Sequence, residues 1–193
     1  ISTNSETDLD HAKFIMRLGQ DLFGLKVSLK KRKREKAVSV KASSVNLVKW
    51  LNNLGMPIGN KLSHNLSIPD WVLTNRNWQK SFIRGLFDTD GCLYLDTHKI
   101  KGKIYKNIGW TLTSYSAKLR QDIVELLINL GFKPTLRSTQ KSVYLRRKND
   151  IDAYFRLIGT SNKKHLTRYR KFIAIRKDTE VVITAPIRNR LEA

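Results

Sequence analysis

The sequence predicts an α+β protein made of two similar units in tandem, and three observations support this fold class. Stretches with apolar residues at helical spacing alternate with pairs of strand-like stretches. The order helix, hairpin, helix occurs twice, at an offset of about 102–107 residues. An apolar helix separates the two occurrences and ends in two carboxylates and a glycine, Asp88-Thr89-Asp90-Gly91.

Composition narrows the class of protein. Apolar residues make up 40% of the 193 residues and charged residues 27%, which is typical of a globular chain with a buried core. Lys and Arg total 37 against 16 acids, and the net charge of +21 favours nucleic acid as a partner, with a membrane-surface or ribosomal role as the alternative. The single Cys92 excludes an internal disulfide and a multi-cysteine zinc site. Without a membrane-spanning run or a signal peptide, we expect an intracellular protein, in cytoplasm, nucleoid or organelle, with no membrane partner.

The first unit is predicted over residues 1–70. Its expected strands are 26–30 and 37–41, and its expected helices run over 7–23 and from Ser43 or Ser44 to Leu54. The apolar face of the first helix consists of Phe14, Ile15, Leu18 and Leu22. Trp50 is expected in the core, and Trp71 against the body of the fold. The basic run from Lys30 to Lys36 joins the strands, either as a solvated loop or as a phosphate contact.

The second unit is predicted over residues 71–177, around the central helix 81–91. Two strands follow this helix, at 92–98 and 104–112. The later elements are expected to be a helix from Ser116 to Gly131, a hairpin of 132–137 with 142–147, and helices over 150–158 and 163–177. Residues 178–193 lack a clear periodicity and are predicted to be an appendage.

The end of the central helix has unusual electrostatics. Asp88 and Asp90 lie in its last turn, where the macrodipole disfavours a carboxylate by roughly 0.3–1 kcal/mol. A divalent cation with oxygen ligands would compensate for this, while an ordinary exposed helix end followed by a turn is the alternative. Gly91 is expected to end the helix in a left-handed conformation. Gly85 would let another helix approach closely.

Residues 83–91, Ile-Arg-Gly-Leu-Phe-Asp-Thr-Asp-Gly, resemble the second signature motif of the LAGLIDADG homing endonucleases. Arg84 and Thr89 stand where that motif has alanines. The identical positions are Gly85, Leu86, Asp88, Asp90 and Gly91, and the apolar ones are Ile83 and Phe87. Together with the repeat, the resemblance extends over residues 1 to about 177. It implies αββαββα units in pseudo-two-fold tandem, with antiparallel sheets that form a DNA-binding saddle.

The resemblance also implies two signature helices that pack against each other, each supplying one metal-binding acid. The first unit has none in this sequence; its helix and first strand would lie before Ile1, which is not a methionine. With both helices present, the resemblance implies a monomer.

The implied activity is metal-dependent hydrolysis of double-stranded DNA at a long target site, with Mg²⁺ as the cofactor. The last acid of the motif corresponds to the metal ligand, here Asp90 with Gly91 beside it, while Asp88 is expected to be structural. A basic residue near the scissile phosphate corresponds to Lys163, and to Lys61 in the first unit. A plain surface charge is the alternative for each lysine.

The strands are expected to supply the DNA contacts, although no base specificity follows from the sequence. The candidates are Lys30, Arg32, Arg34, Tyr94, Asp96, Asn107, Thr111, Arg137, Arg146 and Lys148. Such an enzyme would be intron-encoded or free-standing, as part of a mobile genetic element. The alternative is a relative that binds nucleic acid without cleaving it, either a maturase with intron RNA as its partner or a DNA-binding regulator. A basic ribosome-associated protein would explain the charge, but neither the motif nor the repeat.

Overall fold

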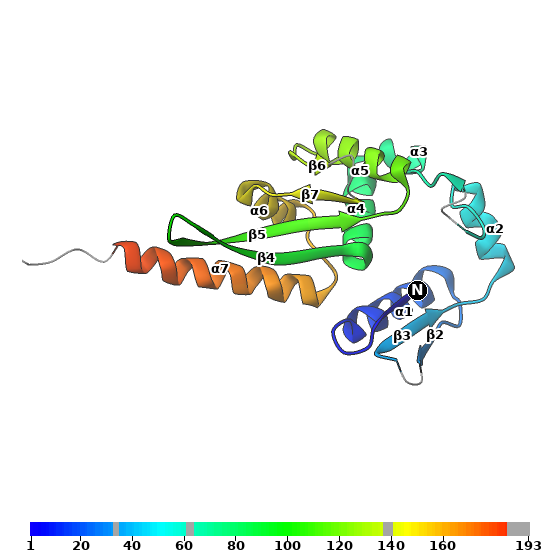
Figure 1. Cartoon of the computed structure of the whole chain (residues 1–193). Coiled ribbons are helices and arrows are strands. Elements are labelled where there is room, and N and C mark those ends of the chain that lie inside the picture. The colour runs from blue at the N-terminus through cyan, green and yellow to red at the C-terminus, as the bar shows by residue number, and fades with distance from the viewer. Residues whose placement is uncertain (33–34, 61–63, 137–140, 185–193) are drawn as a thin grey trace, which may run out of the picture.

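The protein contains two antiparallel sheets; α1 packs against the first, and several helices pack against the second (Figure 1). The structure is a computed structural model that describes residues 1–32, 35–60, 64–136 and 141–184, with side chains described as far as residue 174. We call the elements from β1 to α2 the first unit and those from α4 to α7 the second unit. Antiparallel sheets with helices on one side fit the predicted α+β class.

The first unit has a three-stranded sheet in the order β1-β3-β2. Its elements are β1 (Ser2–Asn4), α1 (Leu9–Phe23), β2 (Ser28–Lys31), β3 (Ala37–Lys41) and α2 (Val45–Asn53). Gly24 ends α1 in the left-handed conformation, with φ of 60°. The hydroxyl of Ser44 caps α2 by accepting a hydrogen bond from the Leu47 amide at 3.1 Å.

The second unit has a four-stranded sheet in the order β4-β5-β7-β6. The short α3 (Asp70–Leu73) leads into it, and its elements are α4 (Arg76–Asp90), β4 (Gly91–Ile100), β5 (Lys103–Thr113), α5 (Ala117–Asn129), β6 (Thr135–Leu136), β7 (Ser142–Leu145), α6 (Lys148–Leu157) and α7 (Lys163–Thr184). The helix α7 lies along the outer strand β4 (Figure 1). Arg168 of α7 holds this strand by donating from Nη1 to the carbonyl of Leu93 at 3.2 Å.

Aromatic rings fill the core of the second unit. Phe87, from the central helix, stacks on Trp110 with ring centroids 5.0 Å apart and meets Tyr154 edge-on at 5.2 Å. All three side chains are fully buried. The buried cluster of the first unit, by contrast, consists of Ala12, Val27, Val38 and Val40.

The apolar face predicted for α1 points largely to solvent. Phe14 is 42% exposed and Leu22 65%, while the residues that α1 buries are His11 and Ala12. The reason is that α1 meets the three-stranded sheet with Ala12, Ile15 and Met16, so only Ile15 of the predicted face is covered.

Of the two predictions for the tryptophans, the one for Trp50 needs correction. Trp50 is 51% exposed and is not a core residue; its ring meets that of Phe23 edge-on, with centroids 6.0 Å apart. Trp71 is also partly exposed, but it is anchored, because its Nε1 donates to the carbonyl of Leu54 at 2.9 Å. Trp71 thus lies against the body of the fold as predicted, where it also meets the ring of Trp78 edge-on.

The prediction of a left-handed Gly91 was wrong. This residue follows α4 with φ of −88° and ψ of 160°, so the chain passes directly from the helix into β4. A glycine is required there for a different reason: a Cβ atom would overlap the ring and carbonyl oxygen of Phe87.

The C-terminal boundary also differs from the prediction. The helix α7 continues to Thr184, well into the predicted appendage, while residues 185–193 lie outside the described part of the chain. Within the residues that the structure describes, none of the helices combines the length and apolar character that a membrane crossing requires.

Candidate functional site

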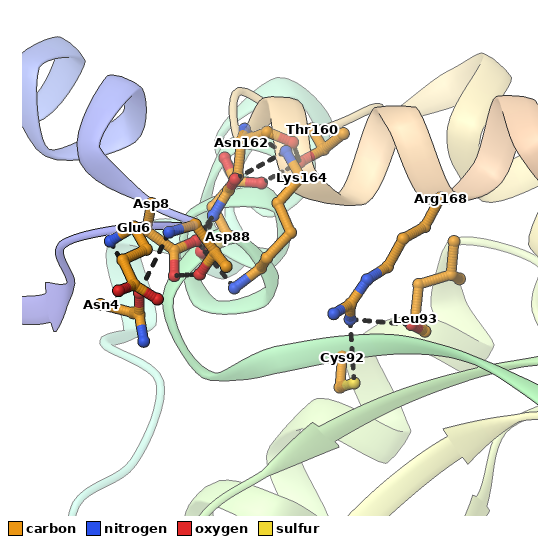
Figure 2. Close-up of polar contacts among 11 residues, drawn as sticks. Asn4, Glu6, Asp8, Asp88, Cys92, Leu93, Thr160, Asn162, Lys164 and Arg168 are labelled. Atoms are coloured by element: carbon orange, nitrogen blue, oxygen red, sulfur yellow. Dashed lines mark hydrogen bonds and ion pairs between the residues drawn. The ribbon is translucent and has the colours of Figure 1, made fainter. Parts of the chain in front are cut away.

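Three segments that are far apart in the sequence meet at the C-terminal end of α4 (Figure 2). They are the last turn of α4, the residues that lead into α7, and the residues that begin α1. Six side chains form what we call the polar junction, namely Asp8, Asp88, Thr160, Ser161, Asn162 and Lys164. The junction joins the first unit to the second.

Asp88 is the buried acid of this junction. Its carboxylate accepts hydrogen bonds from the amide of Ser161 at 2.9 Å, from the hydroxyl of Ser161 at 2.7 Å and from the hydroxyl of Thr160. These donors compensate for the burial of the carboxylate near the negative end of a helix. Asp88 thus fixes the turn that precedes α7, and its role in this structure is structural.

Asn162 connects all three segments. Its side chain is only 2% exposed, and its Nδ2 donates to Asp8 Oδ1 at 2.8 Å and to the main-chain oxygen of Asp88 at 3.1 Å. Its Oδ1 accepts from the amide of Lys164 at 3.0 Å. Both the nitrogen and the oxygen of the Asn162 amide therefore form hydrogen bonds that hold α1, α4 and α7 together.

Asp8 brings a second buried carboxylate to the junction, and it is ionised. Burial alone would raise the pKa of Asp8, but hydrogen bonds from Asn162, Lys164 and Thr7 lower this pKa below its usual value. The ammonium of Lys164 lies 2.7 Å from Asp8 Oδ1. A buried ion pair supported by further hydrogen bonds is costly to break from one side, because the remaining charge is left without a partner.

Two neutral histidines border the junction. His11 and His165 are both buried, and burial lowers the pKa of each, that of His165 to about 4. The ring of His165 packs on Phe87 with centroids 4.5 Å apart, and neither of its nitrogens has a hydrogen-bond partner within the described residues. Both rings therefore belong to the packing of this region rather than to its charge.

Asp90 has the opposite environment from Asp88, although only one residue separates them. It is exposed at the end of α4, and its Oδ2 accepts a hydrogen bond from the hydroxyl of Thr89 at 2.9 Å. The same hydroxyl also contacts the carbonyls of Gly85 and Leu86 at 3.2 Å, which anchors it to the helix. The carboxylate of Asp90 is thus available to an outside ligand.

The oxygen ligands at the end of α4 are of a kind that a hard cation accepts, but they are too few to hold one alone. The carboxylate of Asp90 and the main-chain oxygen of Gly91 are oxygen ligands of the kind that Mg²⁺ accepts, together with waters and substrate phosphates. Among the described residues, however, no group of three or more His, Cys, Asp or Glu side chains could hold a metal ion. A site built on Asp90 therefore needs further ligands from a substrate or from another acid.

Lys163 lies at the first position of α7, directly after the polar junction. Its ammonium is 3.0 Å from Asp10 Oδ2, and its side chain is 78% exposed. The structure thus places it near the meeting point of the two units, paired with an exposed acid of α1. Three other sequence-predicted residues, Lys61, Arg34 and Arg137, lie outside the described residues.

The strand register places most of the remaining candidates on one face of the second sheet. Residues directly opposite each other in an antiparallel pair share a face. Asp96 is opposite Asn107, and Thr111 is opposite Tyr144, so these side chains lie on the face away from the buried Trp110. Tyr94 belongs to the same face by alternation along β4, and Arg146 by alternation along β7.

The candidates of the first unit are arranged differently. Lys30 is opposite Ser39 on the polar face of the first sheet. Arg32 uses its donors for contacts inside the protein. It donates to Ser39 Oγ and Ser2 Oγ at 3.3 Å and pairs with Glu35 at 3.3 Å. Lys148 is not a strand residue: it begins α6 and pairs with Asp152 at 2.7 Å.

The sequence analysis missed Asp8, Thr160, Ser161 and Lys164. The repeated Asn-Lys dipeptide, at 60–61 and 162–163, did point to the correct segment. Its partners were not visible, because Asp8 and Asn162 are separated by 154 positions in the chain. Only the packing of the two units brings them together.

Comparison with known proteins identifies relatives of this fold. A family model described as a LAGLIDADG-like domain matches residues 77–173, about half of the chain. Among solved structures, the chain is similar to meganuclease I-SmaMI bound to uncleavable DNA, with a TM-score of 0.61 and 13% identity over 96% of this chain and 81% of that one. It is also similar to I-LtrWI bound to its target DNA, with a TM-score of 0.59 and 15% identity over 94% and 78%. For I-DmoI in complex with DNA and Mn, the values are 0.56 and 18%, over 82% and 78%.

Two curated relatives are much longer proteins. The tRNA-splicing ligase RtcB of Methanopyrus kandleri is 26% identical in an alignment of length 137, which covers 66% of this chain and 13% of the ligase. The ribonucleoside-diphosphate reductase NrdEB subunit alpha of Bacillus subtilis is 33% identical over 75 residues, 38% of this chain and 6% of the reductase subunit. The chain therefore matches only a small part of each.

Proposed function

Because the chain belongs to the LAGLIDADG homing endonuclease family, we propose that it acts as a site-specific endonuclease on a long target in double-stranded DNA. The observation that carries this proposal is the different environment of the two acids at the end of α4. Asp88 is buried and fixes the helix end, while Asp90 is exposed and keeps its carboxylate available. The net charge of +21 and the polar face of the second sheet suit a polyanionic duplex.

In this proposal Asp90, with the main-chain oxygen of Gly91, holds a Mg²⁺ ion. When bound, the metal polarises the scissile phosphate and lowers the pKa of a coordinated water. The protein's own contribution is positional: the hydrogen bonds to Asp88 keep the end of α4 in place, so Asp90 faces the DNA. Lys163 then stabilises the negative charge that develops on the phosphate oxygens, after the duplex displaces its partner Asp10.

A second acid is required, and we propose that a second signature helix supplies it. Two features support this. Gly85 has no atom within 4 Å of where a Cβ would lie, which leaves room for a closely packed helix. The apolar face of α1, with Phe14, Leu18 and Leu22, is also uncovered. A helix and strand resembling α4 and β4 would complete residues 1–70 as the first of two units, with residues 71–177 as the second.

We also propose that the chain is part of a mobile genetic element. Support comes from the two curated relatives, a ligase and a reductase subunit, whose names denote unrelated activities. Similar segments occupy only 13% of the one and 6% of the other. A segment shared by otherwise different proteins behaves as a separable insert, which fits an origin inside a larger gene or an intron.

One observation favours a second candidate function, the binding of nucleic acid without cleavage. Among the described residues, Asp90 belongs to no cluster of three potential metal ligands. A chain that lacks the second acid would still present its basic sheet faces to DNA, as a regulator, or to intron RNA, as a maturase.

DNA cleavage in the presence of Mg²⁺ distinguishes these functions. The substrate is a plasmid that carries the host locus without the inserted element, and the proteins compared are the wild type, Asp90→Asn and Asp21→Asn. Asp21 is an exposed acid on α1, so its variant controls for the loss of one surface charge. Specific cutting by the wild type and Asp21→Asn, abolished in Asp90→Asn, supports the endonuclease. Salt-sensitive binding without cutting by all three proteins supports the second function instead.

A further inference from the structure

On the polar face of the second sheet, the exposed side chain of Arg146 lies over an aromatic ring. We propose that Arg146 is the specificity-determining residue of the second unit and reads a guanine in the major groove of the bound duplex. This inference rests on the proposed DNA-binding function. It adds to that function the base that the second unit selects.

Arg146 is supported by an aromatic ring and is not neutralised. Its guanidinium carbon lies 4.8 Å from the centroid of the Tyr144 ring, at cation–π distance. Arg146 is exposed, and no carboxylate pairs with it in the part of the chain that the structure describes. In contrast, Arg32 pairs with Glu35, and Lys148 pairs with Asp152. The hydrogen-bond donors of Arg146 therefore remain available to a ligand.

A glycine lets an aromatic ring lie against the strand beside Arg146. The ring of Tyr94 lies on the main chain of Gly109, its direct partner across β4 and β5. A Cβ at Gly109 would lie 2.5 Å from the tyrosine hydroxyl oxygen and 2.7 Å from Cε1, so any other residue would displace the ring. Gly109 precedes Trp110, and Arg146 follows Leu145, the partner of Trp110, so Arg146 lies beside Gly109 and Tyr94 across the sheet. The rings of Tyr94 and Tyr144 thus both lie next to the guanidinium of Arg146.

This arrangement matches the chemistry of one base. Guanine presents two acceptors, O6 and N7, to the major groove, and the forked guanidinium can donate to both at once. A stacked arginine loses less side-chain freedom on binding than a free one, so more of the hydrogen-bond energy contributes to discrimination. A lysine at this position would provide charge without the fork.

The first unit provides an internal contrast. Lys41 lies two residues after Ser39 of β3, and Arg146 lies two residues after Tyr144 of β7, directly after that strand ends. Ser39 offers no ring, and Lys41 is an ammonium, which is suited to phosphate contact rather than to base recognition. The guanine preference is therefore expected in one half of the target only.

Selection from a random double-stranded DNA library at fixed salt tests the inference. The proteins compared are the wild type, Arg146→Lys, Tyr144→Phe, Tyr144→Leu and Arg17→Lys, the last being a matched control at an exposed arginine of α1. We expect a guanine in one half of the wild-type consensus and a 10- to 100-fold weaker preference for it, on the order of 1–3 kcal/mol, in Arg146→Lys. Tyr144→Phe and Arg17→Lys should retain the preference, and Tyr144→Leu should weaken it. Thermal unfolding of each variant checks that the fold is intact.

The outcomes separate the inference from the proposed function. A clear wild-type consensus that Arg146→Lys leaves unchanged overturns the guanine reading alone. If the wild type binds no double-stranded DNA, or prefers RNA in direct competition, both the proposed function and this inference are wrong.

Discussion

The two units of the molecule share the same order of strands and helices but differ in what covers their sheets. In the second unit, α4 places Ile83 and Phe87 fully buried at the centre of a large aromatic core. The described part of the first unit has no helix in that position, and its buried cluster consists of one alanine and three valines. The apolar side of α1 remains exposed as a consequence. The signature helix therefore contributes Ile83 and Phe87 to the core of its unit and also carries the two acids.

The largest expected effect comes from removing that core. Phe87→Ala should destabilise the protein by about 3–5 kcal/mol, because it opens a cavity between Trp110 and Tyr154. Val38→Ala in the first unit should cost only about 1.5 kcal/mol, in proportion to the two methyl groups lost. Urea unfolding of both variants measures the difference. Equal losses would show that the first unit has a larger core than its described contacts indicate.

A smaller effect is expected at the junction that ties the units together. Asn162→Leu should cost about 2–3 kcal/mol, since it leaves Asp8 and the carbonyl of Asp88 buried with one partner fewer. We further expect protease cleavage of the first unit to become faster than that of the second. Asn129→Leu, which changes an exposed asparagine at the end of α5, is the control. Uniform cleavage rates in Asn162→Leu would contradict a linking role.

Lowering the pH should reduce the unfolding free energy through the protonation of His165. The pKa of His165 is about 4, first because of its burial and then because of the charge of Lys164. The unfolded chain protonates this group near 6.5, so stability falls as the pH drops from 6.5 to 4, by about 2 kcal/mol between pH 7.5 and pH 5. Unfolding free energies at the two pH values test this. His165→Phe should remove this part of the pH dependence; an unchanged slope would assign it to other groups.

The smallest effect on stability is expected at Lys163. Its ion pair with Asp10 joins two exposed side chains, so Lys163→Met should change the unfolding free energy by less than about 1 kcal/mol. The same variant should reduce the single-turnover rate of DNA cleavage by about 100-fold if the ammonium stabilises charge on the phosphate. Lys13→Met, at an exposed lysine of α1, controls for the lost charge. A wild-type cleavage rate in Lys163→Met would leave this lysine as a surface charge.

The sequence predicted the element types well because local signals were strong. Helical spacing located α5, and the hydroxyl of Ser44 caps α2 as its position suggested. Features that depend on contacts between distant segments were not predictable. Trp50 has a large apolar side chain of the kind often found in a core, but the small first sheet leaves it exposed. The role of Gly91 depends on the ring of Phe87 behind it, not on its own backbone preference.

The candidate site was predictable to a similar extent. The motif located Asp88 and Asp90, and the repeat located Lys163, but the division between a buried and an exposed acid appears only when residues 160–162 pack on α4. The register of β4 and β5 brings three of the predicted DNA contacts, Tyr94, Asp96 and Asn107, to one face. Which of these residues contact a base or a phosphate stays a prediction.

The contact between α7 and β4 also limits how the protein can associate with other chains. An outer strand offers unpaired main-chain groups to any strand that approaches it. In the second unit, Arg168 occupies the carbonyl of Leu93 and α7 runs along the strand. After α2, in contrast, the described chain leads to the short α3, which packs on α4 instead of on the first sheet. The β4 edge is thereby covered, while β6 is the other outer strand of the second sheet, and β1 and β2 are the outer strands of the first.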